Sequence, residues 1–344
     1  CESISLFNLF IQQKFIILLN MLYPIHFALP SEKIIKSTPT KVKVLSNIIP
    51  GEIELNNYTY NTEESYYQEY RESMFAITHK KNGWDCMRHY EILANGCIPI
   101  FRDIDETPNS IMTSFPKSLV KEGNLLFLDF EGKQFKDLTP YDIERYNILN
   151  KKLLDYTRVF LTTEKLASYI LSTSNNNNVS KVLILNDSTT EDYLADLIIH
   201  GFKNLLGTNC HEFPKKEYLY PNYKPGYNKL YGKGFTYTNT LQTTLRDDFM
   251  DNDIDTHIRS KHYDLIIYPN WHRCLEYYDK IINKLYDPSK VIFICGEDYN
   301  DHEWCTYHLY KDRHPTYVRE LRSEWVDTKL TNKNTHERTW FPQK

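Results

Sequence analysis

Short apolar runs alternate with segments of helical pattern along most of this chain. In the first half, residues 75–78 and 97–101 are apolar runs of strand length on either side of an amphipathic stretch at 85–95. Strand-length runs of this kind predict buried strands, and the stretch between them predicts a helix. The first half therefore contains one predicted β-α-β unit.

The same alternation recurs in the second half. Residues 181–186, 263–268 and 290–294 predict buried strands, and residues 191–206 predict a helix that Gly207 ends. A further helix is predicted over 275–285. Continuous apolar strands alternating with helices are typical of parallel sheets covered on both faces. The predicted fold class is therefore α/β, with two Rossmann-like lobes, each a parallel sheet flanked by helices.

A polar, uncharged stretch separates the two patterned halves. Residues 173–178 read Thr-Ser-Asn-Asn-Asn-Asn and show no periodicity, which is typical of a linker. At 344 residues the chain is long enough for two domains with separate cores. We expect one lobe over 1–172, a linker at 173–180 and a second lobe over 181–344.

Composition and charge narrow the class of partner. Hydrophobic residues make up 41% and charged residues 25%, which is typical of a soluble globular protein. The formal net charge of -4 offers no basic field for a nucleic-acid backbone, so no nucleic-acid partner is expected. Seven cysteines spread thinly over the chain favour reduced thiols and a cytoplasmic location.

The apolar segment at 5–29 bears on membrane association. Polar residues at 8, 12–14 and 20 interrupt it, so no run is long enough to span a bilayer. We interpret the segment as a buried helix. A degenerate signal peptide or membrane anchor is the alternative, so membrane association stays open.

The loop after the first predicted strand combines features that suit a nucleoside diphosphate. Ligands of parallel sheets bind beyond the carboxyl ends of strands, where loops enter helix N-termini. A glycine allows close backbone approach, and a helix N-terminus attracts phosphate. The residues predicted to bind this nucleoside diphosphate are Thr78, Lys80, Lys81, Gly83, Trp84, Asp85, Arg88, His89 and Glu91.

Arg88 and Glu91 are the central pair of this prediction. Residues three apart share one face of a helix. Arg88 could bind phosphate while Glu91 accepts hydrogen bonds from ribose hydroxyls, and Trp84 could pack on a sugar or a base. The alternative is that Arg88 and Glu91 form an ordinary surface ion pair.

The same segment carries a resemblance to a known family. Residues 84–99, in which Arg88 and Glu91 lead into Gly96-Cys97-Ile98-Pro99, resemble the donor-lobe signature of exostosin-like glycosyltransferases. The Tyr66-Tyr67-Gln68-Glu69-Tyr70 helix upstream is similar to that of a bacterial and large-virus group. The resemblance runs from about residue 24 to 124. It implies a GT-B fold, sugar transfer from a nucleoside diphosphate, and donor contacts by Arg88 and Glu91.

The second half resembles the other lobe of that family, in an unusual order. The similar segments are residues 192–196, 200–201, 230–236 and 296–298. In the family this acceptor-side lobe comes first and leads into a segment like 23–30, so the lobes are reversed here. The chain is either a circular permutation or a slice of a tandem array, and in a slice the two lobes need not form one active cleft.

Candidate catalytic residues lie on the helix predicted at 191–206. Asp192, Asp196 and His200 recur at a spacing of four and so share a helix face. A transferase that inverts the anomeric carbon needs a base for the acceptor hydroxyl, and Asp196 or His200 could serve. The alternative is a polar face that caps and pairs locally.

Two further segments could bind a metal ion, but their patterns are less specific than that of the loop predicted to bind the nucleotide. Asp103-Ile104-Asp105 imitates the paired carboxylates of metal-dependent GT-A enzymes, but two acids in a loop are common. Cys295, His302, Cys305 and His308 offer zinc ligands without a Cys-x-x-Cys pair. We expect no metal requirement and no tightly bound cofactor.

The sequence thus predicts a glycosyltransferase that moves a sugar from a nucleoside-diphosphate sugar to a hydroxyl acceptor on a glycan or protein. A non-catalytic nucleotide- or glycan-binding module, or a fragment of a tandem enzyme, is the alternative. An epimerase or dehydrogenase would need a glycine-rich dinucleotide turn, which we do not find.

Overall fold

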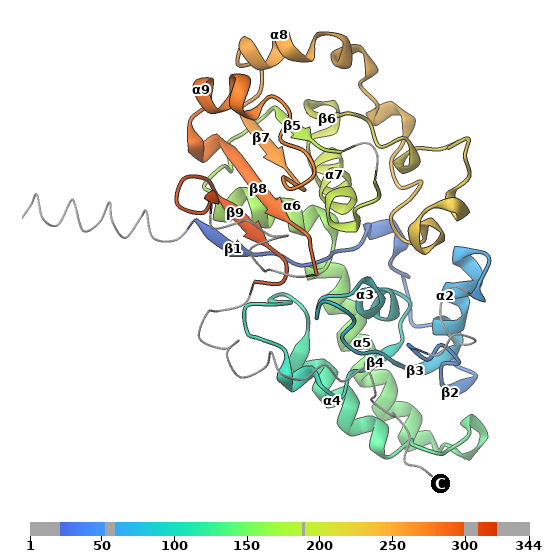
Figure 1. Cartoon of the computed structure of the whole chain (residues 1–344). Coiled ribbons are helices and arrows are strands. Elements are labelled where there is room, and N and C mark those ends of the chain that lie inside the picture. Colours follow the sequence, from blue (N-terminus) through green and yellow to red (C-terminus); the bar gives the residue numbers. More distant parts are fainter. Residues whose placement is uncertain (1–20, 52–58, 188–189, 299–308, 322–344) are drawn as a thin grey trace, which may run out of the picture.

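A computed structural model describes residues 21–51, 59–187, 190–298 and 309–321 of the chain, which contain two parallel sheets (Figure 1). The larger sheet has six strands in the order β1-β9-β8-β7-β5-β6. These are β1 (Leu22–Pro24), β5 (Val182–Leu185), β6 (Cys210–Phe213), β7 (Leu265–Tyr268), β8 (Val291–Cys295) and β9 (Thr316–Val318). The smaller sheet has the order β2-β3-β4, formed by β2 (Lys43–Leu45), β3 (Ser73–Ile77) and β4 (Ile98–Ile100). The predicted α/β class with two parallel sheets is confirmed.

Helices flank both sheets. They are α2 (Glu63–Glu72), α3 (Met87–Ala94), α4 (Lys117–Leu128), α5 (Pro140–Phe160), α6 (Thr163–Thr173), α7 (Tyr193–Leu206), α8 (Ile254–Arg259) and α9 (Asn283–Leu285). Local sequence explains several of their ends. A capping box between Thr139 and Asp142 starts α5, and the Asp192 side chain caps α7. Gly207, at φ +61°, ends α7 as predicted.

The predicted elements and the observed ones agree in type and differ at their ends. The predicted helix over 85–95 is α3, and the predicted strands over 75–78, 97–101, 181–186, 263–268 and 290–294 are β3, β4, β5, β7 and β8. The helix predicted over 275–285 is a π-helical turn, η11 (Tyr278–Ile282), followed by the short α9. Leu183, Ile184 and Ile267 are fully buried, which explains why these strands carry no alternation.

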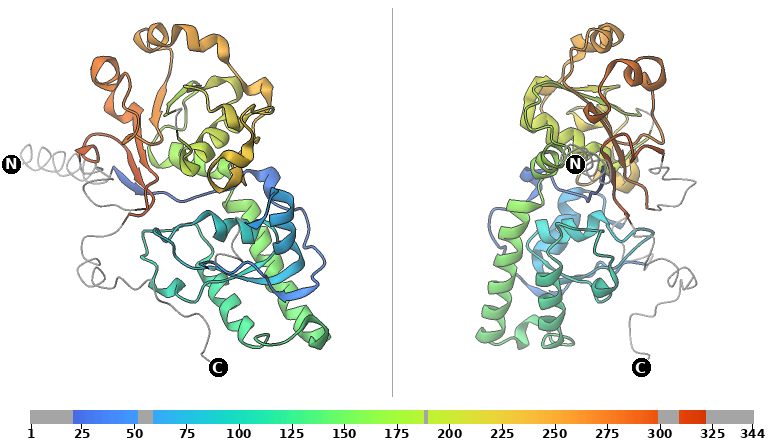
Figure 2. Two further views of the ribbon diagram at one scale, coloured as in Figure 1. Left: turned by 45° about the vertical axis from the view of Figure 1, so that its right-hand side comes forward. Right: turned by 90° about the vertical axis from the view of Figure 1, so that its left-hand side faces the viewer.

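The two sheets define two lobes, which lie one above the other (Figures 1 and 2). The large lobe comprises the described residues of 21–29 and 161–321, and the small lobe those of 30–160. β1 belongs to the large lobe because it pairs with β9, placing Leu22 opposite Thr316. α6 belongs there too, because it packs along α7. A Cβ at Gly201 of α7 would lie only 2.1 Å from the carbonyl oxygen of Thr163, so the close crossing requires glycine.

The division between lobes therefore differs from the expected 1–172 and 181–344. Residues 173–180, expected to be the linker, connect α6 to β5 within the large lobe. Asn176 of that stretch is buried, and its side chain binds Lys290 Nζ at 2.7 Å and the Ser289 carbonyl at 3.1 Å. An asparagine-rich composition indicates a loop, but here the loop is held against the large lobe by these hydrogen bonds.

The chain crosses between the lobes at two places that lie side by side. The Leu29 amide donates to the Leu161 carbonyl at 2.8 Å, and the Thr163 amide donates to the Leu29 carbonyl at 2.9 Å. Leu29 and Thr162 form an isolated parallel bridge. Both crossings are thus tied together, which is the geometry of a two-stranded hinge between domains.

The apolar N-terminal segment lies only partly within the described residues, which begin at 21. The prediction of a buried helix over 5–29 thus falls largely outside them, and residues 22–24 form β1 instead of a helix. Among the helices that the structure describes, none has the length and apolar character to cross a membrane.

Candidate functional site

The turn predicted to hold the nucleoside-diphosphate donor, residues 78–85, lies at the junction of the two lobes, and we call it the donor turn. It follows β3 and leads into α3, and Asp85 anchors it to the large lobe. The Asp85 carboxylate accepts hydrogen bonds from the Phe27 amide at 2.8 Å and from the Tyr90 hydroxyl at 2.6 Å. Burial raises the pKa of Asp85. Asp85 therefore joins α3 to the segment that follows β1, and its side chain is a structural element of the junction.

Gly83 in this turn faces two carboxylates from the ends of β8 and β9. A Cβ built on Gly83 would lie 2.6 Å from Glu320 Oε1 and 3.0 Å from Asp298 Oδ1. Real Cβ atoms do not approach oxygen that closely, so only glycine fits here. The prediction that Gly83 permits close approach agrees with this geometry, but the group that approaches is the protein's own carboxylate.

Glu320 occupies the hydrogen-bonding position that we had assigned to the diphosphate. Its Oε1 accepts the Asp85 backbone N–H at 2.8 Å and lies 3.2 Å from Arg319 Nη1. The side chain is fully buried, and burial raises the pKa of Glu320. Arg319 also bonds Asp298 and the Asp85 carbonyl. The turn before α3 thus binds an anion, as predicted for such a turn, and in this structure the anion is Glu320.

Arg88 and Glu91 share one face of α3, as predicted, and this face is buried against the large lobe. Both residues are 6% exposed. The Glu91 carboxylate accepts hydrogen bonds from the Tyr66 hydroxyl at 2.7 Å and from the Thr236 hydroxyl at 2.5 Å. Tyr67 bonds the same Thr236 oxygen at 2.5 Å. Neither the exposed ligand-binding pair nor the surface ion pair that we considered describes this buried network.

His89 and Thr78 form a buried structural pair. His89 Nε2 lies 2.9 Å from the Trp84 carbonyl oxygen, and Nδ1 lies 2.8 Å from Thr78 Oγ1. A carbonyl only accepts, so Nε2 carries the proton and Nδ1 accepts from the Thr78 hydroxyl. Burial lowers the pKa of His89 to about 3. His89 is therefore neutral, and its two hydrogen bonds connect Trp84 of the donor turn to Thr78 after β3.

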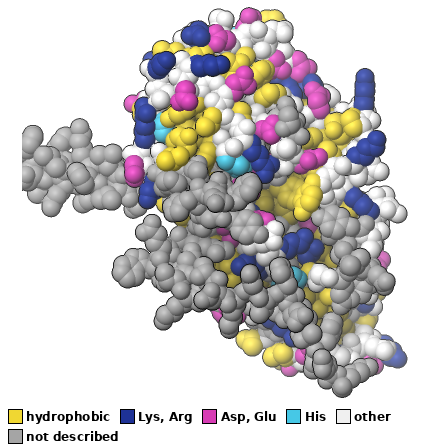
Figure 3. All heavy atoms as spheres, in the orientation of Figure 1, with side chains coloured by type: hydrophobic (Ala, Val, Ile, Leu, Met, Phe, Trp, Pro, Cys, Tyr) yellow, Lys and Arg dark blue, Asp and Glu magenta, His cyan; other side chains and the backbone are white. Residues whose placement is uncertain are grey.

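The exposed cationic part of the turn is formed by its lysines. Lys81 is exposed, whereas Lys80 is partly buried, with Nζ 5.1 Å from the Trp84 ring centroid. Trp84 is 7% exposed and stacks on Phe101. The ring predicted to pack on a sugar or base thus already packs on protein. Lys and Arg side chains are visible at the level where the lobes meet on the face in Figure 3.

The predicted catalytic residues lie apart from this turn, on α7. Both Asp196 oxygens accept from the Tyr218 hydroxyl, at 3.0 and 3.1 Å, and burial raises the pKa of Asp196 to about 8. His200 bonds Thr163 Oγ1 at 2.7 Å through Nδ1 and lies 3.2 Å from Glu32 through Nε2. Both side chains are 1% exposed. These partners lie 22 to 168 positions away in the chain, so the local pairing that we considered as the alternative does not describe them.

The possible metal ligands do not form a described cluster. Within the part of the chain that the structure describes, no group of three or more His, Cys, Asp or Glu side chains is placed to hold a metal ion. Asp105 pairs with Lys121. Cys295 is buried in β8, whereas His302, Cys305 and His308 lie outside the described residues.

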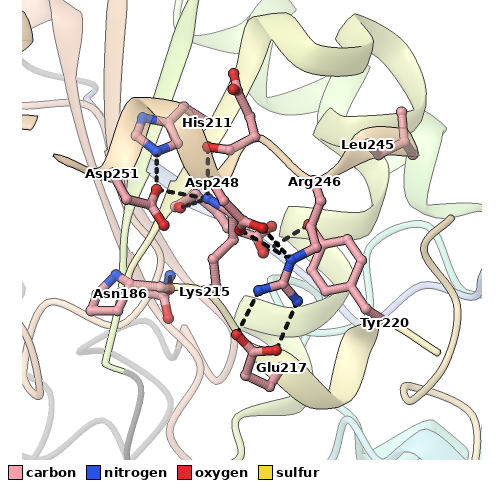
Figure 4. Close-up of polar contacts among 12 residues, drawn as sticks. Asn186, His211, Lys215, Glu217, Tyr220, Leu245, Arg246, Asp248 and Asp251 are labelled. Carbon is pink, nitrogen blue, oxygen red and sulfur yellow. Dashed lines mark hydrogen bonds and ion pairs between the residues drawn. The ribbon is translucent and has the colours of Figure 1, made fainter. Parts of the chain in front are cut away.

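A second polar cluster lies after β6 in the large lobe (Figure 4). Arg246 binds Glu217 through two hydrogen bonds of 2.7 and 2.8 Å, and Lys215 binds Asp251 at 2.7 Å. His211 also binds Asp251, at 2.6 Å, and burial lowers the pKa of His211 to about 4. Because these charges are paired with one another, the cluster fixes the long connection between β6 and α8. The sequence analysis did not identify it.

Two surface cavities lie in the small lobe, away from the donor turn. One of about 700 Å³ lies between residues 36–41 and α5, and one of about 810 Å³ lies beside β2 and residues 130–136. None of the nine predicted donor residues lines either of them. These cavities are therefore separate from the site that the sequence motif indicates.

The structure adds residues to the site that sequence reasoning did not assign. Glu320, Arg319, Asp298 and Thr236 of the large lobe contact the donor turn or α3. Thr236 and Asp298 lie within 230–236 and 296–298, two segments that resemble the family, so a sequence signal existed for these two residues. Arg319 and Glu320 lie beyond any such motif, and only the fold reveals them.

Comparison with known proteins adds no relative. No family model, curated protein or solved structure matches this chain. The family resemblance therefore depends on the motif residues alone.

Proposed function

We propose that this chain is a glycosyltransferase that moves a sugar from a nucleoside-diphosphate sugar to a hydroxyl acceptor on a glycan or protein. The proposal follows from one observation. A glycine turn at the start of α3 already binds a carboxylate through the Asp85 backbone N–H, and it does so where the carboxyl ends of β8 and β9 face the other lobe. Such turns bind phosphate by the same contacts.

The charges around the turn support a diphosphate ligand. Lys81 is exposed beside the turn, Lys80 lies over Trp84, and Arg88 lies in the first turn of α3. Cations and a helix N-terminus neutralise a leaving diphosphate without a metal ion. The donor would bind to these groups and to the backbone of Gly83.

The position of Glu320 sets a condition for this binding. A diphosphate at the Asp85 amide must replace the Glu320 carboxylate, because two anions cannot share one donor in a buried site. The paired crossings at Leu29 and Thr162 offer the hinge for such an opening. After the diphosphate has bound, closure of the two lobes would bring the carboxyl ends of the large-lobe strands into contact with the donor.

Packing of both lobes within one chain favours a single site over a slice of an array. Glu91 of the small lobe bonds Thr236 of the large lobe, and Asp85 bonds Glu320. The acceptor would then be bound by the strand ends of the large lobe, opposite the donor turn.

Calorimetric titration with a panel of nucleoside diphosphates tests the proposal, followed by donor hydrolysis and transfer assays on the same sample. We expect one nucleotide to bind, and Lys81→Ala to weaken it about tenfold by loss of a charge-assisted contact. Lys165→Ala, which removes an exposed lysine of α6, is the matched control and should leave affinity unchanged. A chain that binds no nucleotide of the panel contradicts the proposal.

A non-catalytic nucleotide- or glycan-binding module is the alternative function. It shares the donor turn and would therefore pass the titration. Nucleotide binding without hydrolysis or transfer of any donor in the panel would favour the module over the enzyme.

A further inference from the structure

His272 and Glu297 form a hydrogen-bonded pair at the carboxyl edge of the six-stranded sheet. His272 lies in the turn that follows β7, and Glu297 follows β8, the neighbouring strand. His272 Nε2 lies 2.6 Å from Glu297 Oε1. Ligands of parallel sheets bind at this edge, so a histidine and a carboxylate here are in position to act on one.

The pair fixes which nitrogen of His272 is free to accept a proton. A carboxylate only accepts, so Nε2 carries the hydrogen and the lone pair of the neutral ring is on Nδ1. Nδ1 is buried, and no hydrogen-bond partner reaches it from any described residue. A base oriented by a carboxylate, with its other nitrogen available, is the arrangement that general-base catalysis requires.

Glu297 is itself held in place and stays ionised. Arg273 Nη2 donates to the same Oε1 at 2.7 Å, and Arg273 Nη1 reaches Thr190 Oγ1 at 3.1 Å, near the start of α7. The hydrogen bond from His272, followed by the hydrogen bond and the charge of Arg273, lowers the pKa of Glu297 although burial opposes this. An ionised Glu297 would stabilise the imidazolium that forms when Nδ1 takes a proton.

Two buried amides lie at the same edge with hydrogen-bonding capacity unused. Asn186 follows β5 and Asn270 lies two residues after β7, and these strands are neighbours. Both side chains are at most 1% exposed. Among the described residues nothing bonds Asn186 Oδ1 or either polar atom of Asn270. Buried amides are normally satisfied, so these groups indicate a ligand that both donates and accepts hydrogen bonds, as sugar hydroxyls do.

The pair is connected to the donor turn by a single residue step. Glu297 bonds His272, and the next residue, Asp298, has its Oδ1 3.0 Å from the position of a Cβ on Gly83. Successive Cα atoms are only ~3.8 Å apart. The His272–Glu297 pair and the carboxylate beside Gly83 are therefore held by the same short segment after β8.

We propose that Asn186, Asn270 and the His272–Glu297 pair form the acceptor site, which binds a sugar hydroxyl, and that His272 is its general base. The acceptor oxygen bonds to the anomeric carbon while its proton moves to His272 Nδ1. The bond between that carbon and the diphosphate oxygen breaks, and the nucleoside diphosphate leaves with the electron pair. This inference rests on the proposed function for its donor, but the sugar site itself does not.

Asp196 and His200, the two candidates of the sequence analysis, are less suited to this role. Asp196 is bonded through both oxygens to Tyr218, and His200 through both nitrogens to Thr163 and Glu32. Their proton-accepting atoms are engaged within the protein. His272 Nδ1 has no such bond to a described residue.

Substitution tests the catalytic role. His272→Gln and His272→Ala should lower transfer about a hundredfold or more while leaving nucleotide affinity unchanged, and added imidazole should restore part of the rate in His272→Ala. His262→Gln is the control, because the His262 ring contacts those of His257 and Tyr263 before β7, at the opposite end of that strand from His272. Glu297→Gln should lower the rate less than His272→Gln, because Glu297 acts through His272. Transfer at the wild-type rate in His272→Gln overturns the proposal.

A titration that needs no donor tests the sugar site separately. In imidazole ¹⁵N spectra, with His272 assigned by His272→Gln, Nδ1 should have the shift of an unprotonated nitrogen and should move when methyl glycosides are added. A response to glycosides in a chain that binds no nucleotide would keep the sugar site and reject the proposed enzyme. Nucleotide turnover without any response at Nδ1 would keep the enzyme and reject the acceptor site. No response and no nucleotide binding would reject both. If His272→Gln fails to fold, the His272 signals are assigned instead by the change that Glu297→Gln produces in them, because Glu297 bonds the same ring.

Discussion

A Cβ atom on Gly83 would lie 2.6 Å from Oε1 of Glu320, which belongs to the other lobe. Glu320 cannot yield easily, because its side chain is fully buried and Oε1 is bonded to the Asp85 amide. The two lobes therefore approach each other tightly at the turn where the sequence predicts that a ligand should bind. This relationship makes the junction sensitive to a single methyl group.

Gly83→Ala is expected to destabilise the protein by about 1–3 kcal/mol through overpacking. Urea denaturation followed by circular dichroism would measure the loss. In the double variant Gly83→Ala/Glu320→Ala the added methyl no longer meets the nearer of the two carboxylates, so the cost of Gly83→Ala should be smaller than in the wild-type background. An equal cost in both backgrounds would mean that the two residues are not in contact.

Glu320→Gln is expected to strengthen nucleoside diphosphate binding roughly tenfold, because it removes a negative charge from the anion-binding turn. Glutamine keeps the oxygen that accepts the Asp85 N–H, so the packing is preserved. Calorimetry on both proteins measures the difference. Glu276→Gln, at an exposed glutamate of the large lobe, controls for net charge. Unchanged or weaker binding in Glu320→Gln would place the diphosphate elsewhere.

Thr236→Val is expected to destabilise the protein by about 1–3 kcal/mol. The substitution keeps the branched shape and removes the hydroxyl that bonds Glu91 and Tyr67, so a buried carboxylate loses a donor. Thr236→Ser retains the hydroxyl and should cost much less. Urea denaturation of the three proteins decides the matter, and equal losses in both variants would attribute the effect to packing alone.

The parts of the fold that the sequence predicted are those in which burial is continuous along the chain. β5, β7 and β8 are apolar throughout, and α7 has a capping aspartate and a terminating glycine. β1, β2, β4 and β9 have three residues each, which is too short for any periodicity to appear, and of these only β4 was predicted, from the apolar run at 97–101. β1 exists because it pairs with β9 from the far end of the chain, and no local signal encodes such pairing.

The candidate site was likewise predicted only in part from the sequence. A spacing of three correctly predicted that Arg88 and Glu91 share a helix face. Which face is buried depends on Thr236 and on the strand ends of the large lobe, so exposure could not be predicted. His272 was missed because a histidine in a loop has no spacing that marks it, and its role depends on Glu297 of the neighbouring strand.

Asp196→Asn is expected to stabilise the protein at high pH and to have a smaller effect in acid. Burial raises the pKa of Asp196 to about 8, so between its ordinary value of 3.8 and about 8 the folded state holds a proton that the unfolded state has lost. Stability due to this group therefore falls as pH rises through that window and levels off above about 8. Asparagine carries no charge and still accepts from the Tyr218 hydroxyl, so it removes the pH dependence and keeps the contact.

The measurement is the difference in unfolding free energy between the variant and the wild type at several pH values. The advantage of Asp196→Asn should grow by roughly 2–4 kcal/mol from pH 5 to pH 8. Asp142→Asn is the control, because hydrogen bonds from Thr139 lower the pKa of Asp142 below its ordinary value of 3.8, so its difference from the wild type should not change between pH 5 and pH 8. A difference for Asp196→Asn that does not change between pH 5 and pH 8 would mean that Asp196 is ionised in the folded protein, and hence that it lies in a wetter environment than α7 and Tyr218 provide.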